Sequence, residues 1–120
     1  MESKELISVI NNSVNELDFV TARRHIEENS DLVKHFKVHL NSNAREILNF
    51  ILDKKNQDAK PLTRSEINTI NAINVYASKF DIRGLKLVIK GKESLFLREE
   101  VLAYLNTDAK IMLEGMGTIK

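Results

Sequence analysis

Histidine is the residue type whose spacing in this chain comes nearest to a reactive site. His35 and His39 are four residues apart, so on a helix their rings would share one face, as two metal ligands do. The intervening residues, FKV, place no glutamate beside the first histidine, as the zinc-protease pattern requires. No third ligand is evident, and the chain contains no cysteine. We therefore expect two surface histidines and predict no metal site.

The other polar residues form no catalytic pattern. Serines and threonines lie mostly where helix caps are expected and outside any nucleophile motif. Glu27–Glu28 and Glu99–Glu100 are adjacent pairs, whose side chains would diverge by about 100° on a helix. The stretch GKES at Gly91 lacks the upstream glycine and the Lys-Ser/Thr ending of a phosphate-binding loop. We predict that the protein is not an enzyme, with no catalytic residue and no cofactor.

Basic residues are concentrated in one segment of the second half of the chain. The segment 79–92 has one acidic residue, Asp81, and a local net charge of +4. Its five basic residues are Lys79, Arg83, Lys86, Lys90 and Lys92. On a helix, Arg83, Lys86 and Lys90 would follow one edge and could track a phosphate backbone. Aromatic residues for base stacking are scarce there, and no helix-turn-helix signature is evident. A small nucleic-acid-binding regulator that uses this patch is therefore the alternative function, and a solvated helix face is the simplest interpretation.

The composition is that of an ordinary soluble domain. Of 120 residues, 42% are hydrophobic and 29% are charged, and the net charge of +1 creates no general attraction to nucleic acid or acidic membranes. The N-terminus lacks a signal-peptide pattern, and no apolar run approaches the roughly 18 residues of a membrane span. We expect a single domain over residues 1–120, located in the cytoplasm and without membrane contact.

Two lines of the sequence are nearly the same. LNSNAREIL at 40–48 and LNTDAKIML at 105–113 match at an offset of 65, with four identities and four chemically similar pairs. Upstream, matches continue at an offset of 63, among them Asp18/Asp81 and Ile26/Ile89. Because the matches fall on apolar faces and helix caps, we predict a tandem duplication of about 55 residues. Repeat 1 would cover about residues 2–53, repeat 2 about 63–117, and residues 54–62 would link them.

The duplication decides how residues 85–97 are interpreted. LKLVIKGKESLFL alternates around a glycine like a β-hairpin, whereas its counterpart at 22–34, ARRHIEENSDLVK, has helical spacing. Because duplicated units share a fold, we predict an all-α protein of about six to eight helices in two tandem, similar repeats of three or four helices. An α+β fold with a hairpin at 85–97 remains the alternative. No tetratricopeptide, ankyrin or HEAT consensus is readable, so the likeness to helical-repeat scaffolds is one of architecture only.

Helix starts and buried faces can be predicted from caps and apolar stripes. The expected cap residues are Asp18, one of Asn41, Ser42 and Asn43, Thr63 in a capping box with Glu66, Asp81, and Thr107 or Asp108. The apolar stripe that begins at Ile67 continues to Phe80, which we therefore expect in the core.

Two basic positions recur in both repeats, as Arg23/Lys86 and Arg45/Lys110. Each adjoins a core position, so its charge would lie at the border of a buried face. Long basic side chains can simply cover apolar surface, but four cations could also line one groove, or two equivalent grooves, that receives an acidic segment. We therefore predict a non-catalytic helical-repeat module for protein–protein interaction or adaptor function. Its partner would be an acidic protein, and its oligomeric state is unassigned.

Overall fold

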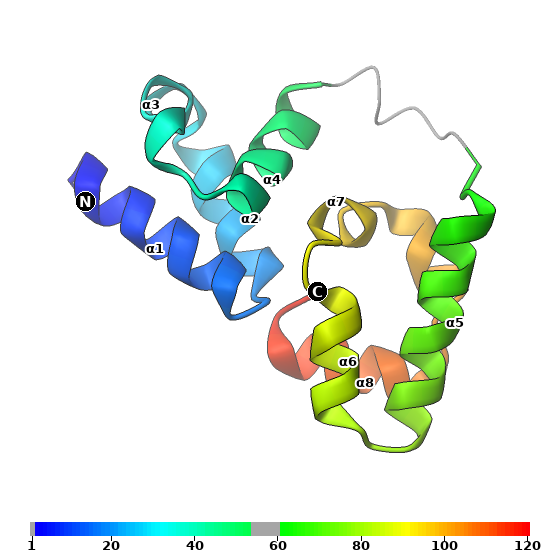
Figure 1. The fold of residues 1–120 in the computed structure, drawn as a ribbon. Coiled ribbons are helices and arrows are strands. Elements are labelled where there is room, and N and C mark those ends of the chain that lie inside the picture. The colour runs from blue at the N-terminus through cyan, green and yellow to red at the C-terminus, as the bar shows by residue number, and fades with distance from the viewer. Residues whose placement is uncertain (1, 54–60) are drawn as a thin grey trace.

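The computed structural model describes residues 2–53 and 61–120, and within these ranges the chain is helical and contains no strand (Figure 1). In chain order the elements are α1 (Ser3–Asn15), α2 (Phe19–Glu28), α3 (Ser30–His35), the 3₁₀ helix η1 (Lys37–His39), α4 (Ser42–Leu52), α5 (Arg64–Ser78), α6 (Ile82–Ile89), α7 (Glu93–Phe96), the 3₁₀ helix η2 (Glu99–Ala103) and α8 (Thr107–Met116). The all-α prediction is confirmed. The hairpin alternative at 85–97 is wrong, because this range holds the end of α6, a turn at Gly91 and helix α7. No helix in the described ranges is long and apolar enough to cross a bilayer.

The two halves of the chain, residues 2–53 and 61–120, differ in how their helices pack. In the first half, α1 and α2 pack together, and both α3 and α4 pack against them. In the second half, α5 packs on α6 and α8, but α7 packs on α4 of the first half (Figure 1). Most of the predicted linker, residues 54–60, lies outside the described residues. Helix α7 therefore joins the two halves.

Three predicted caps mark the starts of α2, α5 and α6. The Asp18 carboxylate accepts from the Thr21 N–H at 3.1 Å, and the Asp81 carboxylate accepts from the Gly84 N–H at 2.9 Å. Thr63 and Glu66 form the predicted capping box. The Thr63 hydroxyl accepts from the Glu66 N–H, and the Glu66 carboxylate accepts from the Thr63 N–H. Each cap satisfies an N–H that the first helical turn leaves without an intrahelical acceptor.

An asparagine caps the last helix of each half. Asn41, one of the three expected residues, accepts from the Ala44 N–H at 2.7 Å. The expectation of Thr107 or Asp108 for α8 is wrong, since Asn106 takes this role and accepts from the Ala109 N–H at 2.8 Å. The reason lies in the backbone. Asn106 is extended (φ −76°, ψ 172°), as a cap residue must be, whereas Thr107 is already the first residue of the helix.

The two asparagine caps are held in place in the same way. The Asn41 N–H donates to Asn11 Oδ1, and the Asn106 N–H donates to Asn74 Oδ1, both at 2.9 Å. The Nδ2 groups of Asn11 and Asn74 in turn donate to main-chain carbonyl oxygens two residues before each cap, those of His39 and Tyr104. These bonds recur at the offsets of 63 and 65 found in the sequence. The duplication itself stays a prediction, because α3 packs on α1 and α2 of its own half whereas α7 packs on α4 of the other half.

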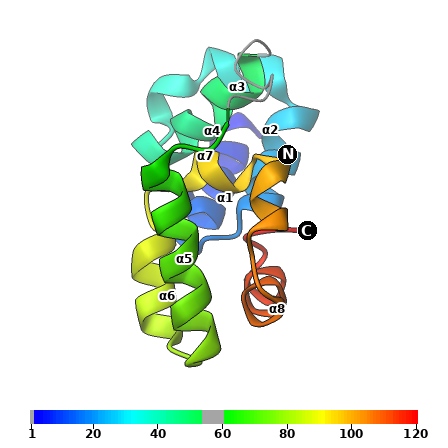
Figure 2. The ribbon, with the colours of Figure 1, turned by 90° about the vertical axis from the view of Figure 1, so that its right-hand side faces the viewer.

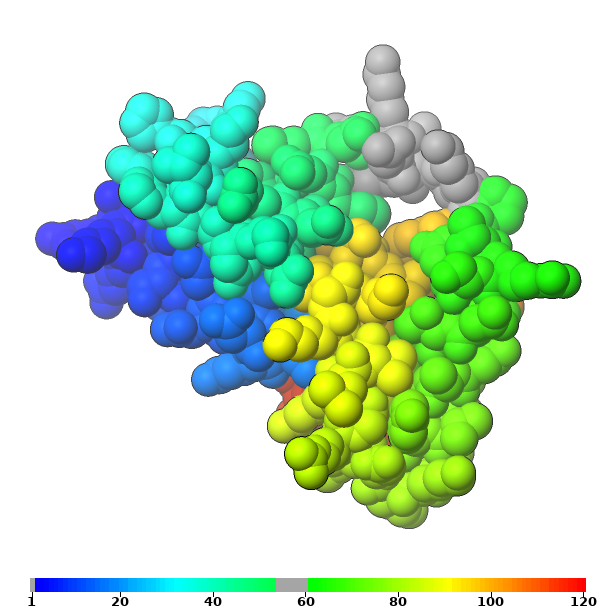
Figure 3. All heavy atoms as spheres, in the orientation of Figure 1, coloured from blue at the N-terminus to red at the C-terminus, as the bar shows by residue number. Residues whose placement is uncertain are grey.

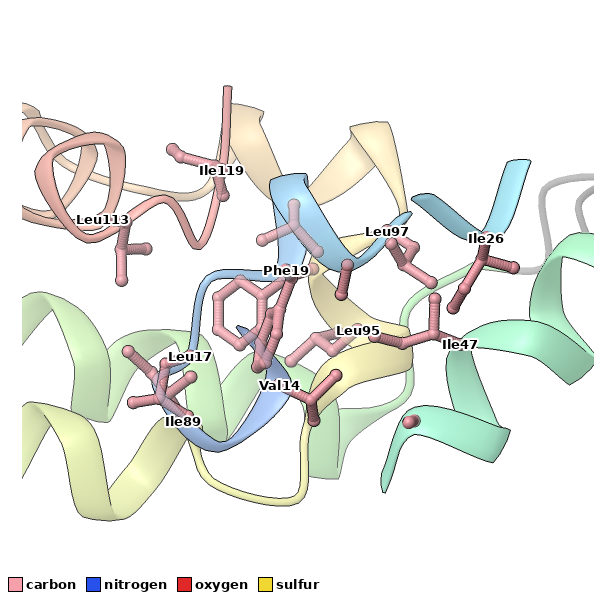
Figure 4. Packing of buried hydrophobic residues seen from close by; sticks show 14 of the residues in the cluster. Val14, Leu17, Phe19, Ile26, Ile47, Ile89, Leu95, Leu97, Leu113 and Ile119 are labelled. Atoms are coloured by element: carbon pink, nitrogen blue, oxygen red, sulfur yellow. The ribbon is translucent and has the colours of Figure 1, made fainter. Parts of the chain in front are cut away.

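A hydrophobic core runs through both halves, with α7 at its centre. Phe19 of α2 lies 6.1 Å from Phe96 of α7, ring centre to ring centre. Figure 4 shows Val14, Phe19 and Leu95 gathered where the first and second halves meet. The prediction that Phe80 belongs to this core is wrong, because its side chain is 73% exposed. Helix α5 ends at Ser78 and Phe80 has a φ of 54°, so this residue leaves the buried face of the stripe.

Candidate functional site

Each half has a tight corner between its first two helices, and the two corners are built alike. The first corner is residues 16–20 and the second corner is residues 79–83. Leu17 and Phe80 are the two non-glycine residues with positive φ, 64° and 54°, in the described chain. In both corners the next residue is the aspartate that caps the following helix. The corners therefore turn the chain with the same backbone conformation.

Two main-chain hydrogen bonds of the first corner recur in the second corner, which adds one of its own, from the Ile82 N–H to the Phe80 carbonyl oxygen at 3.1 Å. Leu17 and Phe80 donate their N–H groups to carbonyl oxygens three residues earlier, both at 3.0 Å. Asp18 and Asp81 donate theirs to carbonyl oxygens five residues earlier, at 2.8 and 2.9 Å. The second corner can therefore be interpreted position by position from the first.

The first corner is covered by the C-terminal tail, residues 117–120. The Val20 N–H donates to the Gly117 carbonyl oxygen at 2.9 Å, and the Thr118 hydroxyl donates to the Leu17 carbonyl oxygen at 2.8 Å. A Cβ atom on Gly117 would overlap the Asp18 carboxylate, so the tail can cross the corner only with a glycine there. Leu17 is 6% exposed under this cover.

The second corner is uncovered. Phe80 is 73% exposed and Ile82 is 52% exposed, although their counterparts Leu17 and Phe19 are both buried. Among the described residues, nothing accepts a hydrogen bond from the Arg83 N–H, the counterpart of the Val20 N–H that binds the tail. Figures 1 and 2 place this corner at one extremity of the molecule, at the bottom of both views.

The predicted nucleic-acid patch lies on the same part of the chain. Its five cations are all exposed: Lys79 at the end of α5, Arg83 and Lys86 on α6, and Lys90 and Lys92 around the turn after it. Leu87, 69% exposed, shares a helix face with Arg83. We call the five cations together with Phe80, Ile82 and Leu87 the basic–apolar surface. Figure 3 shows α6, in yellow-green, on the face of the molecule toward the viewer.

The four recurring cations lie on four different helices. Arg23 is on α2, Arg45 on α4, Lys86 on α6 and Lys110 on α8. Arg23 is half-buried and forms an ion pair with Glu27 one turn later, whereas the other three are exposed. Of the four, Lys86 belongs to the basic–apolar surface and Arg23 lines the pocket described next.

A pocket of about 560 Å³ lies between α2, the segment 96–102 and the C-terminal tail. Its apolar lining comes from Phe19, Val20, Phe96, Leu97, Leu102 and Ile119. Charged residues of both signs also line it, and three of them form ion pairs. Arg23 pairs with Glu27, and Arg98 lies 3.3 Å from Glu66 and 3.5 Å from Glu100, two residues outside the lining. The Thr118 hydroxyl is engaged with Leu17. These groups can hold an amphipathic molecule, and none is placed as a free nucleophile.

The two spaced histidines do not share a helix. Helix α3 ends at His35, and His39 ends η1, so the expected four-residue helical spacing is interrupted. Both are exposed and flank Phe36, with ring centres 4.8 and 6.3 Å from it. Within the described ranges, no three His, Cys, Asp or Glu side chains converge as metal ligands would.

One buried carboxyl group was not foreseen from the sequence. Glu93, the first residue of α7, is 1% exposed, and its Oε1 accepts from the Gly91 N–H at 3.2 Å. Its Oε2 has no hydrogen-bond partner in the described part of the chain. Burial raises the pKa of Glu93 above its ordinary value, and the nearby charge of Glu46 on α4 acts in the same direction. An acidic residue after a glycine turn gave no signal that it would be buried.

No protein-family model, curated protein or solved structure matches this chain. The geometry alone therefore characterises it as an all-helical protein with one covered and one uncovered corner. Sequence reasoning found the five cations but missed Phe80 and Ile82 as surface residues. The offset of 63 could have indicated them, since it aligns Phe80 with Leu17 at a turn before a capping aspartate.

Proposed function

We propose that this protein is a non-catalytic interaction module that binds an acidic protein through the basic–apolar surface. The observation that carries this proposal is the exposure of Phe80, Ile82 and Leu87 among five cations on one corner and one helix. Large apolar side chains exposed together commonly mark binding surfaces. Aromatic residues are frequent energetic anchors in protein interfaces.

The charges define the partner's chemistry. Asp81 is the one acidic residue in the segment, and its carboxylate already accepts from the Gly84 N–H. The cations therefore favour a partner that brings carboxylates to the rim and apolar side chains to the centre. Rim charges act mainly on the association rate and on its dependence on salt.

Affinity purification from native cells, with and without nuclease, tests this function. The bait is the parent chain, compared with a variant carrying Arg83→Gln, Lys86→Gln and Lys90→Gln. The control variant carries Lys4→Gln, Lys34→Gln and Lys37→Gln, three exposed cations of the first half. We expect an acidic protein that survives nuclease, is retained by the control and is lost from the first variant. Equal capture by both variants would contradict the proposal.

The second candidate is a nucleic-acid-binding regulator, and the exposure of all five cations of the patch favours it. In that case the captured partners would be lost on nuclease treatment. Affinity for a single-stranded oligonucleotide would then fall with salt, with a logarithmic slope of about −0.7 per phosphate contacted. Each Lys or Arg changed to Gln would reduce this slope by about the contribution of one contact.

A further inference from the structure

We propose that the second corner is a receiving site for a partner segment in which glycine is followed by a hydroxyl residue and an aliphatic residue. This inference rests on the proposed function and names the part of the partner that binds. Its basis is the first corner, where a segment of this form, Gly117–Thr118–Ile119, is seated on the same backbone geometry.

The residue at position 80 contributes little to the folding of this chain. A left-handed conformation is unfavourable for a bulky L-residue, and glycine or asparagine would adopt it more readily. At the first corner, burial of Leu17 beneath the tail offsets that cost. Phe80 has the same backbone conformation, yet its ring is largely in solvent. A covering segment would give the ring the burial that Leu17 has.

Each group that holds the tail has a counterpart at the second corner. The Arg83 N–H corresponds to the donor that binds the Gly117 carbonyl. The Phe80 carbonyl corresponds to the acceptor of the Thr118 hydroxyl; it already accepts from the Ile82 N–H at 3.1 Å, and its second lone pair remains for a hydroxyl donor. Asp81 corresponds to Asp18, the aspartate that requires glycine in the crossing chain. Ile82 occupies the place of Phe19. The second corner thus presents one donor, one acceptor, a glycine-selective crossing and an apolar contact.

The charges around the corner distinguish its ligand from the chain's own tail. Lys79 and Lys90 stand where the first half has Glu16 and Glu27. The partner segment should therefore carry acidic residues on either side of the glycine.

A second copy of this chain does not supply such a segment. The chain has a single Gly–Thr pair and no Gly–Ser pair, and its Thr118 and Ile119 are already buried at the first corner. At the end of α4, the position corresponding to Gly117 is Leu52, whose side chain could not cross the aspartate. The occupant is therefore a different, acidic protein.

Three end-blocked octapeptides provide the test. The binding peptide is residues 113–120 of this chain with Gly115→Glu and Lys120→Glu, sequence LEEMGTIE. Its matched control adds Gly117→Ala, which changes one methyl group. Each is titrated into the ¹⁵N-labelled full-length chain, and into its Ile82→Asp variant, at low salt. The peptide without the two glutamate substitutions, LEGMGTIK, measures the electrostatic contribution.

We expect LEEMGTIE to shift the amide signals of residues 79–83 and to leave those of 16–20 unchanged. The unsubstituted peptide LEGMGTIK should bind the same residues about tenfold more weakly, since it lacks the added carboxylates. The alanine control and the Ile82→Asp variant should show no saturable binding. Shifts at 16–20, equal binding of the alanine control, or no binding at millimolar peptide would each overturn the inference. A single-stranded oligonucleotide that binds residues 79–83 more tightly than LEEMGTIE would also overturn it. If the peptides fail while the acidic partner is still captured through Arg83, Lys86 and Lys90, only this inference is lost.

Discussion

The same substitution at the two corners should change stability in opposite directions. Asparagine tolerates a left-handed backbone better than leucine or phenylalanine, which relieves about 1 kcal/mol at either position. Leu17 is only 6% exposed, so Leu17→Asn also removes about 2–3 kcal/mol of stabilisation from the burial of its apolar side chain. Its net effect should be a loss of about 1–2 kcal/mol. Phe80 is 73% exposed, so its ring contributes only about 0.5 kcal/mol, and Phe80→Asn should gain about 0.5 kcal/mol.

Thermal and urea unfolding of the two variants and the parent measure this difference. A change of 1 kcal/mol corresponds to about 4 °C in Tm for a chain of this size. We expect Phe80→Asn to melt about 2 °C above the parent and Leu17→Asn to melt about 4–8 °C below it. If Phe80→Asn is destabilised as strongly as Leu17→Asn, the ring of Phe80 is covered within the chain and the second corner is not open.

Three further outcomes are expected. Changing Arg23, Arg45, Lys86 and Lys110 together to Gln should weaken capture of the acidic partner at low salt through the loss of Lys86, the one of the four on the basic–apolar surface, with little change in Tm; a variant that melts well below the parent and still captures its partner would assign these residues to the scaffold. Thr118→Val should lower the free energy of unfolding by about 1–2 kcal/mol in urea titrations, because it leaves the buried Leu17 carbonyl without its donor; an unchanged urea midpoint would mean that the tail does not hold the first corner. For Glu93 the pKa is raised in the folded chain, so its stabilising contribution is present below the unfolded value of about 4.3 and is lost as the pH rises through the folded pKa. Glu93→Gln should therefore raise the Tm at pH 7 but not at pH 4, and a gain of the same size at both would contradict the raised pKa.

Local sequence was sufficient to predict the helical fold and the starts of α2, α4, α5 and α6. Asp18, Thr63 and Asp81 were identified as caps because their side chains can satisfy N–H groups within three residues, a purely local relation. The buried face of α1 is likewise a local pattern, because Leu6, Ile7, Ile10 and Val14 have helical apolar spacing and all four are buried.

The errors fall where tertiary structure overrides a local pattern. Phe80 continues the apolar stripe of α5 in sequence, but a left-handed residue after the helix end turns its side chain away. The burial of Glu93 could not be predicted either, because it results from α7 packing on α4 rather than on its own half. The second corner is open because the C-terminal tail packs on the first corner instead, and a local sequence pattern does not indicate on which corner the tail packs.

Amide hydrogen exchange at Arg83, measured without and with LEEMGTIE, tests most directly whether the second corner is open and takes the proposed segment. The Val20 amide serves as the internal reference, because it donates to Gly117 at the covered first corner. We expect the Val20 amide to be protected throughout, and the Arg83 amide to exchange freely in the unliganded chain and to become protected on addition of the peptide. An Arg83 amide that is already as protected as Val20 before any peptide is added, or one that the saturating peptide leaves unprotected, would contradict the proposed site.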